Sequence, residues 1–196
     1  MENRLFEYFK NALKGGLCAT YKHEWQKAKG DKELLVRLAL QQQSLPHMIS
    51  YAASGQGLTK EYVMDAFADY INGNYTAIDV DGVQGGYKTQ LWAGFDGYIY
   101  VDQADVMAMM WCEIEAMSIR TAKAVKIYVG CGSSINLSCD GYNNVTILLF
   151  DNSKVMLDDI DKDSHVTVFR YSDKATVECG RYCMGDVKIH DKDLRL

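Results

Sequence analysis

The chain has 196 residues, of which 48% are hydrophobic and 24% are charged, and its formal net charge is −5. This composition excludes an intrinsically disordered protein, and a chain of this length can bury roughly 70% of its unfolded surface without disulfides or a metal. No run of 18 apolar residues occurs, which excludes a membrane-spanning helix. The acidic balance argues against a general nucleic-acid binder.

The first residues, 1–9, have charges between their apolar residues, so they lack the core of a signal peptide. We therefore expect a protein that stays in the cytoplasm of the producing cell. The chain has six cysteines, and without an export signal we expect reduced, mostly buried thiols rather than a disulfide framework. These are Cys18, Cys112, Cys131, Cys139, Cys179 and Cys183.

Residues 1–74 predict a helical N-terminal region. Apolar residues recur at helical spacing from Leu5 to Leu13. Asp31 and Thr59 are candidate N-caps, and Pro46 fits only the first turn of a helix. Gly73 is the expected stop of the last helix.

A short repeat dominates residues from about 123 to 190. A valine or isoleucine, one intervening residue and a second apolar residue recur every ten or eleven positions, which predicts short strands with one buried face. The pairs are Val125/Ile127, Ile135/Leu137, Val145/Ile147, Val155/Leu157, Val166/Val168, Val177/Cys179 and Val187/Ile189.

Two architectures fit these strands: a β-solenoid, and an antiparallel sandwich or meander. A small or polar residue precedes most of the anchors, so every unit has the same direction. Translation of one unit explains this directly, and the solenoid is favoured. Three units would make one triangular coil, which gives two or three coils. The expected fold class is α+β, with a β-rich region over 75–196.

The segment between the helices and the repeats gives two further predictions. Phe95-Asp96-Gly97 has the composition of a hairpin turn between strands at 87–93 and 98–101. Residues 106–116 fit both strand alternation and helical spacing. We favour strand, because Ile114 precedes Val125 by about one repeat.

The units at 150–155 (FDNSKV) and 171–177 (YSDKATV) resemble the D-N-S-x-V repeats of uncharacterised proteins of bacterial prophages and mobile elements. Residues 31–73 resemble the front part of such proteins. The resemblance implies a β-helical repeat region and a link to phage structure or host interaction, including a place in a phage particle. It carries over no catalytic residue.

The acidic run 158–163 suggests a Ca²⁺ site, but Ser164 and Arg170 stand where an EF-hand loop needs Gly and Glu. A solvated turn is the better interpretation, although Asp158 and Asp161 could serve as the carboxylates of a sugar-cleaving β-helix. Cys179 and Cys183 have three residues between them rather than the two of redox or zinc pairs, so we interpret Cys179 as a stacked structural thiol.

Five aromatic residues near the turns of successive units are the candidate interaction surface, unless they fill the corners of the coils. They are Tyr142, Phe150, Phe169, Tyr171 and Tyr182. We expect no catalytic residue, cofactor or metal. The predicted function is a non-catalytic structural or protein-interaction module that binds a protein partner or itself, without nucleic acid or membrane. The alternative is a small carbohydrate-binding or carbohydrate-active protein that uses the solenoid face.

Overall fold

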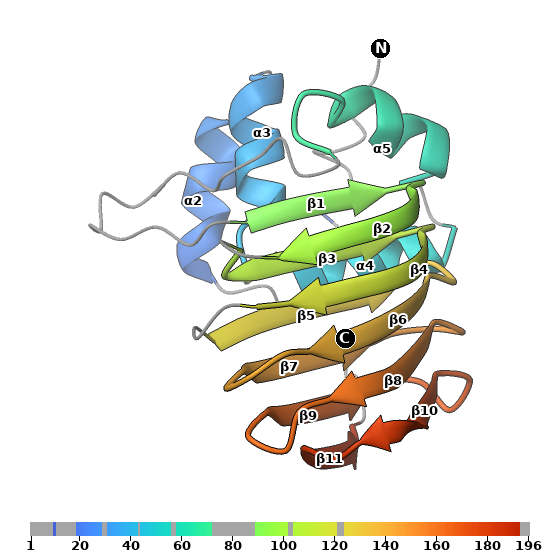
Figure 1. The fold of residues 1–196 in the computed structure, drawn as a ribbon. Coiled ribbons are helices and arrows are strands. Elements are labelled where there is room, and N and C mark those ends of the chain that lie inside the picture. Colours follow the sequence, from blue (N-terminus) through green and yellow to red (C-terminus); the bar gives the residue numbers. More distant parts are fainter. Residues whose placement is uncertain are drawn as a thin grey trace.

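The computed structural model describes residues 10, 19–28, 31–42, 44–55, 58–71, 89–101, 104–120 and 124–192. The expectations for Leu5 to Leu13, Cys18 and Gly73 lie outside these residues. Within the described residues, four helices precede eleven strands, and the strands wind into two parallel sheets (Figure 1).

The helices are α2 (Ala19–Lys27), α3 (Lys32–Ala39), α4 (Leu45–Ala53) and α5 (Lys60–Ala66). Both predicted N-caps are confirmed: the carboxylate of Asp31 accepts from the Leu34 amide at 3.0 Å, and the Thr59 hydroxyl accepts from the Tyr62 amide at 3.3 Å. Pro46 lies in the first turn of α4, as predicted, where a missing amide hydrogen costs no helical bond.

The strands alternate between two sheets, so each coil has two strands. The odd sheet has the order β1-β3-β5-β7-β9-β11, the even sheet has the order β10-β8-β6-β4-β2, and every pairing is parallel. The strands are β1 (Thr89–Ala93), β2 (Asp96–Val101), β3 (Val106–Met110), β4 (Glu113–Ile119), β5 (Ala124–Gly130), β6 (Ser134–Cys139), β7 (Asn144–Leu149), β8 (Lys154–Ile160), β9 (His165–Arg170), β10 (Thr176–Cys183) and β11 (Asp186–Asp191).

These parallel pairings confirm the solenoid and exclude the antiparallel alternative. The expected triangular coil of three units is wrong, because the chain returns to the same sheet after two strands. There are accordingly about five coils, not two or three.

The inward residues of successive coils lie directly above one another. Val125 pairs with Val145, and Val145 with Val166; on the even sheet Ile135 pairs with Val155. These side chains are at most 3% exposed and fill the space between the sheets. The repeated pairs therefore predicted the buried face of β5 to β9 correctly, whereas Cys179 of β10 and Ile189 of β11 are exposed.

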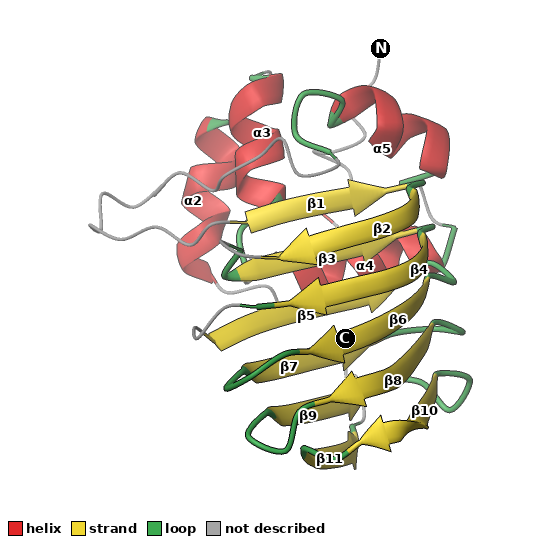
Figure 2. Ribbon diagram, in the orientation of Figure 1, coloured by secondary structure: helices red, strands yellow, loops and turns green. Residues whose placement is uncertain are grey.

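Tight corners connect the two sheets (Figure 2). A residue with a positive φ lies in each of the first four corners after odd strands: Gly94, Trp111, Cys131 and Asp151. The predicted hairpin at Phe95–Gly97 is wrong, because β1 and β2 lie in different sheets and this segment turns one of these corners. The strand prediction for residues 106–116 is confirmed, with a corner at Trp111 that divides the segment between β3 and β4.

The buried polar residues of the corners have hydrogen-bond partners within the stack. The Ser133 hydroxyl donates to the Gly130 carbonyl at 2.6 Å and accepts from the Cys112 amide of the preceding coil at 3.1 Å. The Asn143 side-chain amide donates to the Asp140 and Gly141 carbonyls. These bonds offset the cost of burying polar groups at the points where the chain turns.

The helices pack against the outer face of the odd sheet at its first coils, so they share a hydrophobic core with β1, β3 and β5. Trp25, Leu35 and Met48 of the helices are fully buried in this cluster together with Ala108 and Met110 of β3. Strand β3 is buried on both faces for this reason.

Gly130 allows the close approach of α4 to the solenoid. A Cβ atom on Gly130 would overlap Cγ2 of Ile49. A larger residue at position 130 therefore requires the Ile49 side chain or α4 to move.

We expect Val155→Asp to lower the free energy of unfolding by at least about 3 kcal/mol, because it buries an unpaired carboxylate in the middle of the stack. Val155 is 2% exposed. The control is Lys154→Asp, a change at the exposed neighbour on the other face of β8, which should cost less than about 1 kcal/mol. Chemical denaturation measures both, and similar losses would contradict the inward register.

We expect Gly130→Ala to cost about 1–3 kcal/mol by forcing Ile49 and α4 outward. The same change in an Ile49→Ala background should cost much less, because the clashing methyl group is then absent. A double-mutant cycle on the free energy of unfolding measures the coupling, and additive losses would show that Ile49 is not the obstacle.

Candidate functional site

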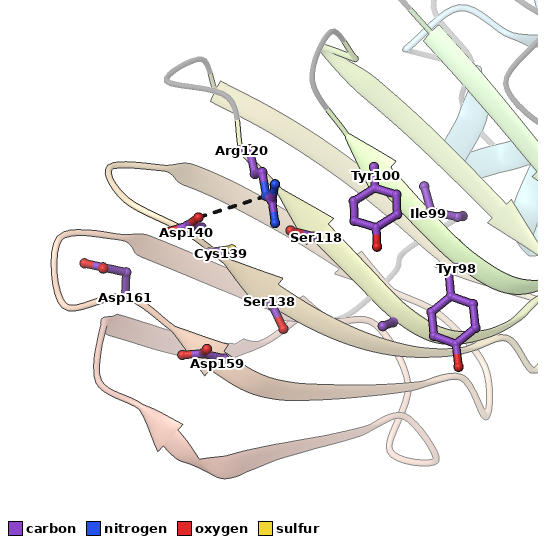
Figure 3. Close-up of a pocket in the computed structure, with 11 residues that line it drawn as sticks. Tyr98, Ile99, Tyr100, Ser118, Arg120, Ser138, Cys139, Asp140, Asp159 and Asp161 are labelled. Carbon is purple, nitrogen blue, oxygen red and sulfur yellow. Dashed lines mark ion pairs between the residues drawn. The ribbon is translucent and has the colours of Figure 1, made fainter.

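A trough of about 360 Å³ lies on the outer face of the even sheet (Figure 3). Strand alternation brings its side chains to this face, because residues two apart on a strand point the same way. Four neighbouring strands of the even sheet contribute Tyr98 and Tyr100 of β2, Ser118 of β4, Ser138 of β6 and Asp159 of β8. Arg120, Asp140 and Asp161, which directly follow β4, β6 and β8, complete the lining.

Two tyrosines form one end of the trough. Tyr98 and Tyr100 are 62% and 73% exposed, so their rings present apolar surface to water that no described part of the fold covers. A hydrogen bond with the Glu115 carboxylate, together with its negative charge, raises the pKa of Tyr98 and keeps the phenol protonated.

Carboxylates dominate the other end of the trough. Asp140, Asp159 and Asp161 line it, and Arg120 is the one cation among the lining residues. The Arg120 Nε lies 4.0 Å from the Asp140 Oδ2, and its guanidinium lies 5.9 Å from the centre of the Tyr100 ring. Three carboxylates and one guanidinium line the trough, and that guanidinium already contacts Asp140 and Tyr100. The trough therefore has an excess of negative charge.

Bulges in the even sheet accompany the trough. Register shifts occur beside Tyr98 in the pairing of β2 with β4, and beside Ser138 in the pairing of β6 with β8. An extra residue in one strand bends and twists that strand locally. We attribute the hollow in this face to these bends, because the odd sheet pairs without register shifts and carries the helices instead.

The structure does not bring the five predicted aromatic residues together on one face. Phe150 is 3% exposed and stacks on Tyr171 at 5.2 Å, and both pack against the helices. These two therefore fill a corner, which was the other interpretation of the pattern. Phe169 stacks on His190 at 5.3 Å on the odd sheet.

The other two aromatic residues are exposed, one on a turn and one on a strand. Tyr142 is 62% exposed on the turn between β6 and β7, with its ring edge toward His165. Tyr182 is 58% exposed at the end of β10. The sequence pattern missed Tyr98 and Tyr100, although their alternation directly after Gly97 was a signal for an exposed strand face.

The cysteines of the described residues are free thiols. Cys179 occupies the position above Leu157, as predicted for a stacked residue, but it is exposed because no further strand covers β10 among the described residues. In the acidic run, the Asp161 carboxylate accepts from the Asp163 amide at 2.9 Å within a turn.

In the part of the chain that the structure describes, no group of three or more His, Cys, Asp or Glu side chains is placed to hold a metal ion. Across the same residues, no helix has the length and apolar character needed to cross a membrane.

We expect iodoacetamide at pH 8 to modify Cys179 and to leave Cys139 unmodified in the folded protein. Burial raises the pKa of Cys139 to about 12, so almost none of its thiol is ionised, and the side chain is 2% exposed. Peptide mass spectrometry measures both positions, with protein unfolded in guanidinium as the control in which both react. Equal reaction in the folded state would show that the coils open readily.

Comparison with known proteins gives no relative from which a role could be carried over. No protein-family model, no curated protein and no solved structure matches the chain. The features of this chain that bear on its function are therefore the trough and the ends of the solenoid.

Proposed function

We propose that the protein is a non-catalytic interaction module that binds a basic segment of a protein partner in the trough of the even sheet. The observation that carries this proposal is the charge of the trough. Three aspartates line it against one arginine, and that arginine is paired with Asp140. Carboxylates arranged in this way attract lysine and arginine side chains and disfavour anionic ligands.

The two tyrosines supply the apolar part of the proposed contact. Tyrosine is enriched among residues that dominate binding energy, because it offers a large rigid surface at low entropic cost. The exposed rings of Tyr98 and Tyr100 also provide faces for a cation, as Tyr100 already does for Arg120. A cationic side chain entering the trough would therefore meet both a ring and a carboxylate.

The exposure of the carboxylates favours binding over catalysis. The Asp140 side chain is 75% exposed. General acid–base catalysis needs a carboxyl group whose proton affinity is tuned by burial or by a close partner. A solvated acidic face suits reversible recognition better. The resemblance to prophage repeat proteins agrees with an interaction role and stays a prediction.

A second candidate is the binding of a neutral oligosaccharide, and the tyrosines favour it. Exposed aromatic rings beside hydroxyl and carboxylate groups, here Ser118, Ser138 and Asp159, are able to contact sugar rings and their hydroxyls. The charge of the trough gives this candidate no support, which is why we place it second.

We expect the double change Asp159→Asn and Asp161→Asn to weaken binding of a fluorescent oligolysine decapeptide about fivefold, because each exposed ion pair contributes up to about 1 kcal/mol. Fluorescence anisotropy at low ionic strength measures the dissociation constant. The double change Tyr98→Ala and Tyr100→Ala should weaken binding as well. Non-specific attraction between the peptide and the negative charge of the protein would not depend on the two rings.

The matched control is Asp65→Asn with Asp69→Asn, which changes the net charge equally at exposed positions in and just after α5. This control should leave the affinity nearly unchanged. Equal weakening by both pairs would reduce the effect to overall charge and contradict the proposal. The second candidate would be favoured if the protein binds maltohexaose or cellohexaose but not the peptide, and if the change of both tyrosines to alanine abolishes the sugar binding.

A further inference from the structure

The last coil leaves both sheets with an open edge. Strand β11 pairs only with β9, and β10 only with β8, among the described strands. Three of the large hydrophobic residues that are exposed gather here: Tyr182 is 58% exposed, Met184 66% and Ile189 45%. Figure 1 shows this end of the solenoid opposite the helices.

At this end, every second residue of β10 and β11 points its backbone hydrogen-bonding groups to the open edge. The amide of Asp186 donates to the carbonyl of Ser164, directly before β9, and the amide of Lys192 donates to the carbonyl of Arg170, the last residue of β9. Because successive residues of a strand point their backbone groups to opposite sides, those of Val187 and Ile189 point to the open edge. On the other sheet, the amides of Thr176 and Met184 donate to the carbonyls of Ser153 and Ile160. By the same alternation, the backbone groups of Cys179 and Cys183 point to the open edge of β10.

The end is also stepped, because the odd sheet has six strands and the even sheet five. Strand β11 thus extends half a coil beyond β10. A second copy, rotated by 180° about an axis parallel to the strands, would place its own β10 against β11 and its own β11 against β10. Both steps are then filled, and each new pair is antiparallel.

The opposite end cannot take part in the same contact. Helix α5 lies against β1, and Ile71 forms a bridge to Leu91 of that strand. Association through one open end of each copy closes after two chains, because an isologous contact leaves no further matching surface.

We propose that two copies of this chain form a symmetric dimer in which β11 of each pairs antiparallel with β10 of the other. The register follows from the corners: the start of β11 meets the end of the partner copy's β10. Cys179 and Cys183 lie at the levels of Leu137 and Cys139 in the even sheet, so β10 has two more residues than β6 over this step. With these two residues accommodated as a bulge, Val187 faces Cys183 and Ile189 faces Cys179, which are inward residues on both strands. This proposal is independent of the trough, which lies on β2 to β8.

The outward side chains are complementary in that register. Lys188 faces the ring of Tyr182 of the other copy, and His190 faces Glu178. The charged residues of β11 would disfavour pairing with an arbitrary strand, as they do on many edge strands. Against β10 of a second copy, Lys188 meets an aromatic ring and His190 meets a carboxylate.

The first measurement is the mass of the full chain by size-exclusion chromatography with light scattering and by sedimentation velocity. We expect a species of twice 22.1 kDa. Ile189→Glu should raise the dimer dissociation constant at least tenfold, because it places a carboxylate beside apolar Cys179 of the partner copy. The control is Tyr142→Glu, the same kind of change at an exposed residue on a turn away from this end, which should leave the dimer intact.

A charge exchange tests the register itself. His190→Glu should weaken the dimer through repulsion of Glu178 of the other copy, and adding Glu178→Lys should restore it. These residues lie on the outer faces of opposite sheets, so they cannot compensate each other within one chain. Both are exposed, so folding should survive, and thermal melting verifies this.

A monomer at every concentration would overturn the proposal, as would a trimer or larger assembly. A dimer that Ile189→Glu and His190→Glu leave intact would overturn it as well, since it would use another surface. Restoration of the dimer by the charge exchange would support this interface and its register. Loss of peptide binding by the trough variants would leave all of these results unchanged.

Discussion

The register between coils is the constraint on which the rest of the structure depends. An inward residue must lie above an inward residue, so the chain must return to the same place after 20 residues from Val125 to Val145 and after 21 from Val145 to Val166. This repetition lets parallel backbone hydrogen bonds and the aliphatic core form together. It also determines which side chains face outward, and so where the protein is able to bind anything.

The two outer faces differ although the interior is uniform. On the odd sheet, apolar outward residues such as Ala108 and Tyr128 recruit the helices, and this face becomes a second core. On the even sheet, the outward residues are tyrosines, serines and aspartates, and the described helices do not cover them. The first coils of the odd sheet thus contribute to stability through their outer face, while the outer face of the even sheet remains available for binding.

The strands could be predicted from the sequence because period-two alternation reports burial directly. The number of strands per coil could not, because it depends on the corner conformation. A positive φ is uncommon in residues other than glycine, yet Trp111, Cys131 and Asp151 adopt one. The sequence therefore gives little sign that the chain reverses direction at these residues. The strands were therefore predicted correctly, but the prediction of three strands in each coil was wrong.

The candidate site was less predictable than the fold. Tyr98 and Tyr100 precede the recognised repeats, and their partners Ser118, Arg120 and Asp159 become neighbours only through stacking of coils. Aromatic residues near turns were a poor guide, because Phe150 and Tyr171 are taken up by packing against the helices. Exposure of an aromatic ring depends on what packs against that sheet, and no local pattern contains this information.

The corner between β9 and β10 shows how such a chain accommodates changes in length. It is longer than the other corners after odd strands, yet Val177 still pairs with Val155, 22 residues earlier. An added residue in a corner is absorbed outside the stack, whereas one in a strand must form a bulge, because otherwise it would turn the following inward side chains of that strand outward. Insertions and deletions should therefore accumulate at corners or come as whole coils, so that related chains differ in height while their cross-section stays the same.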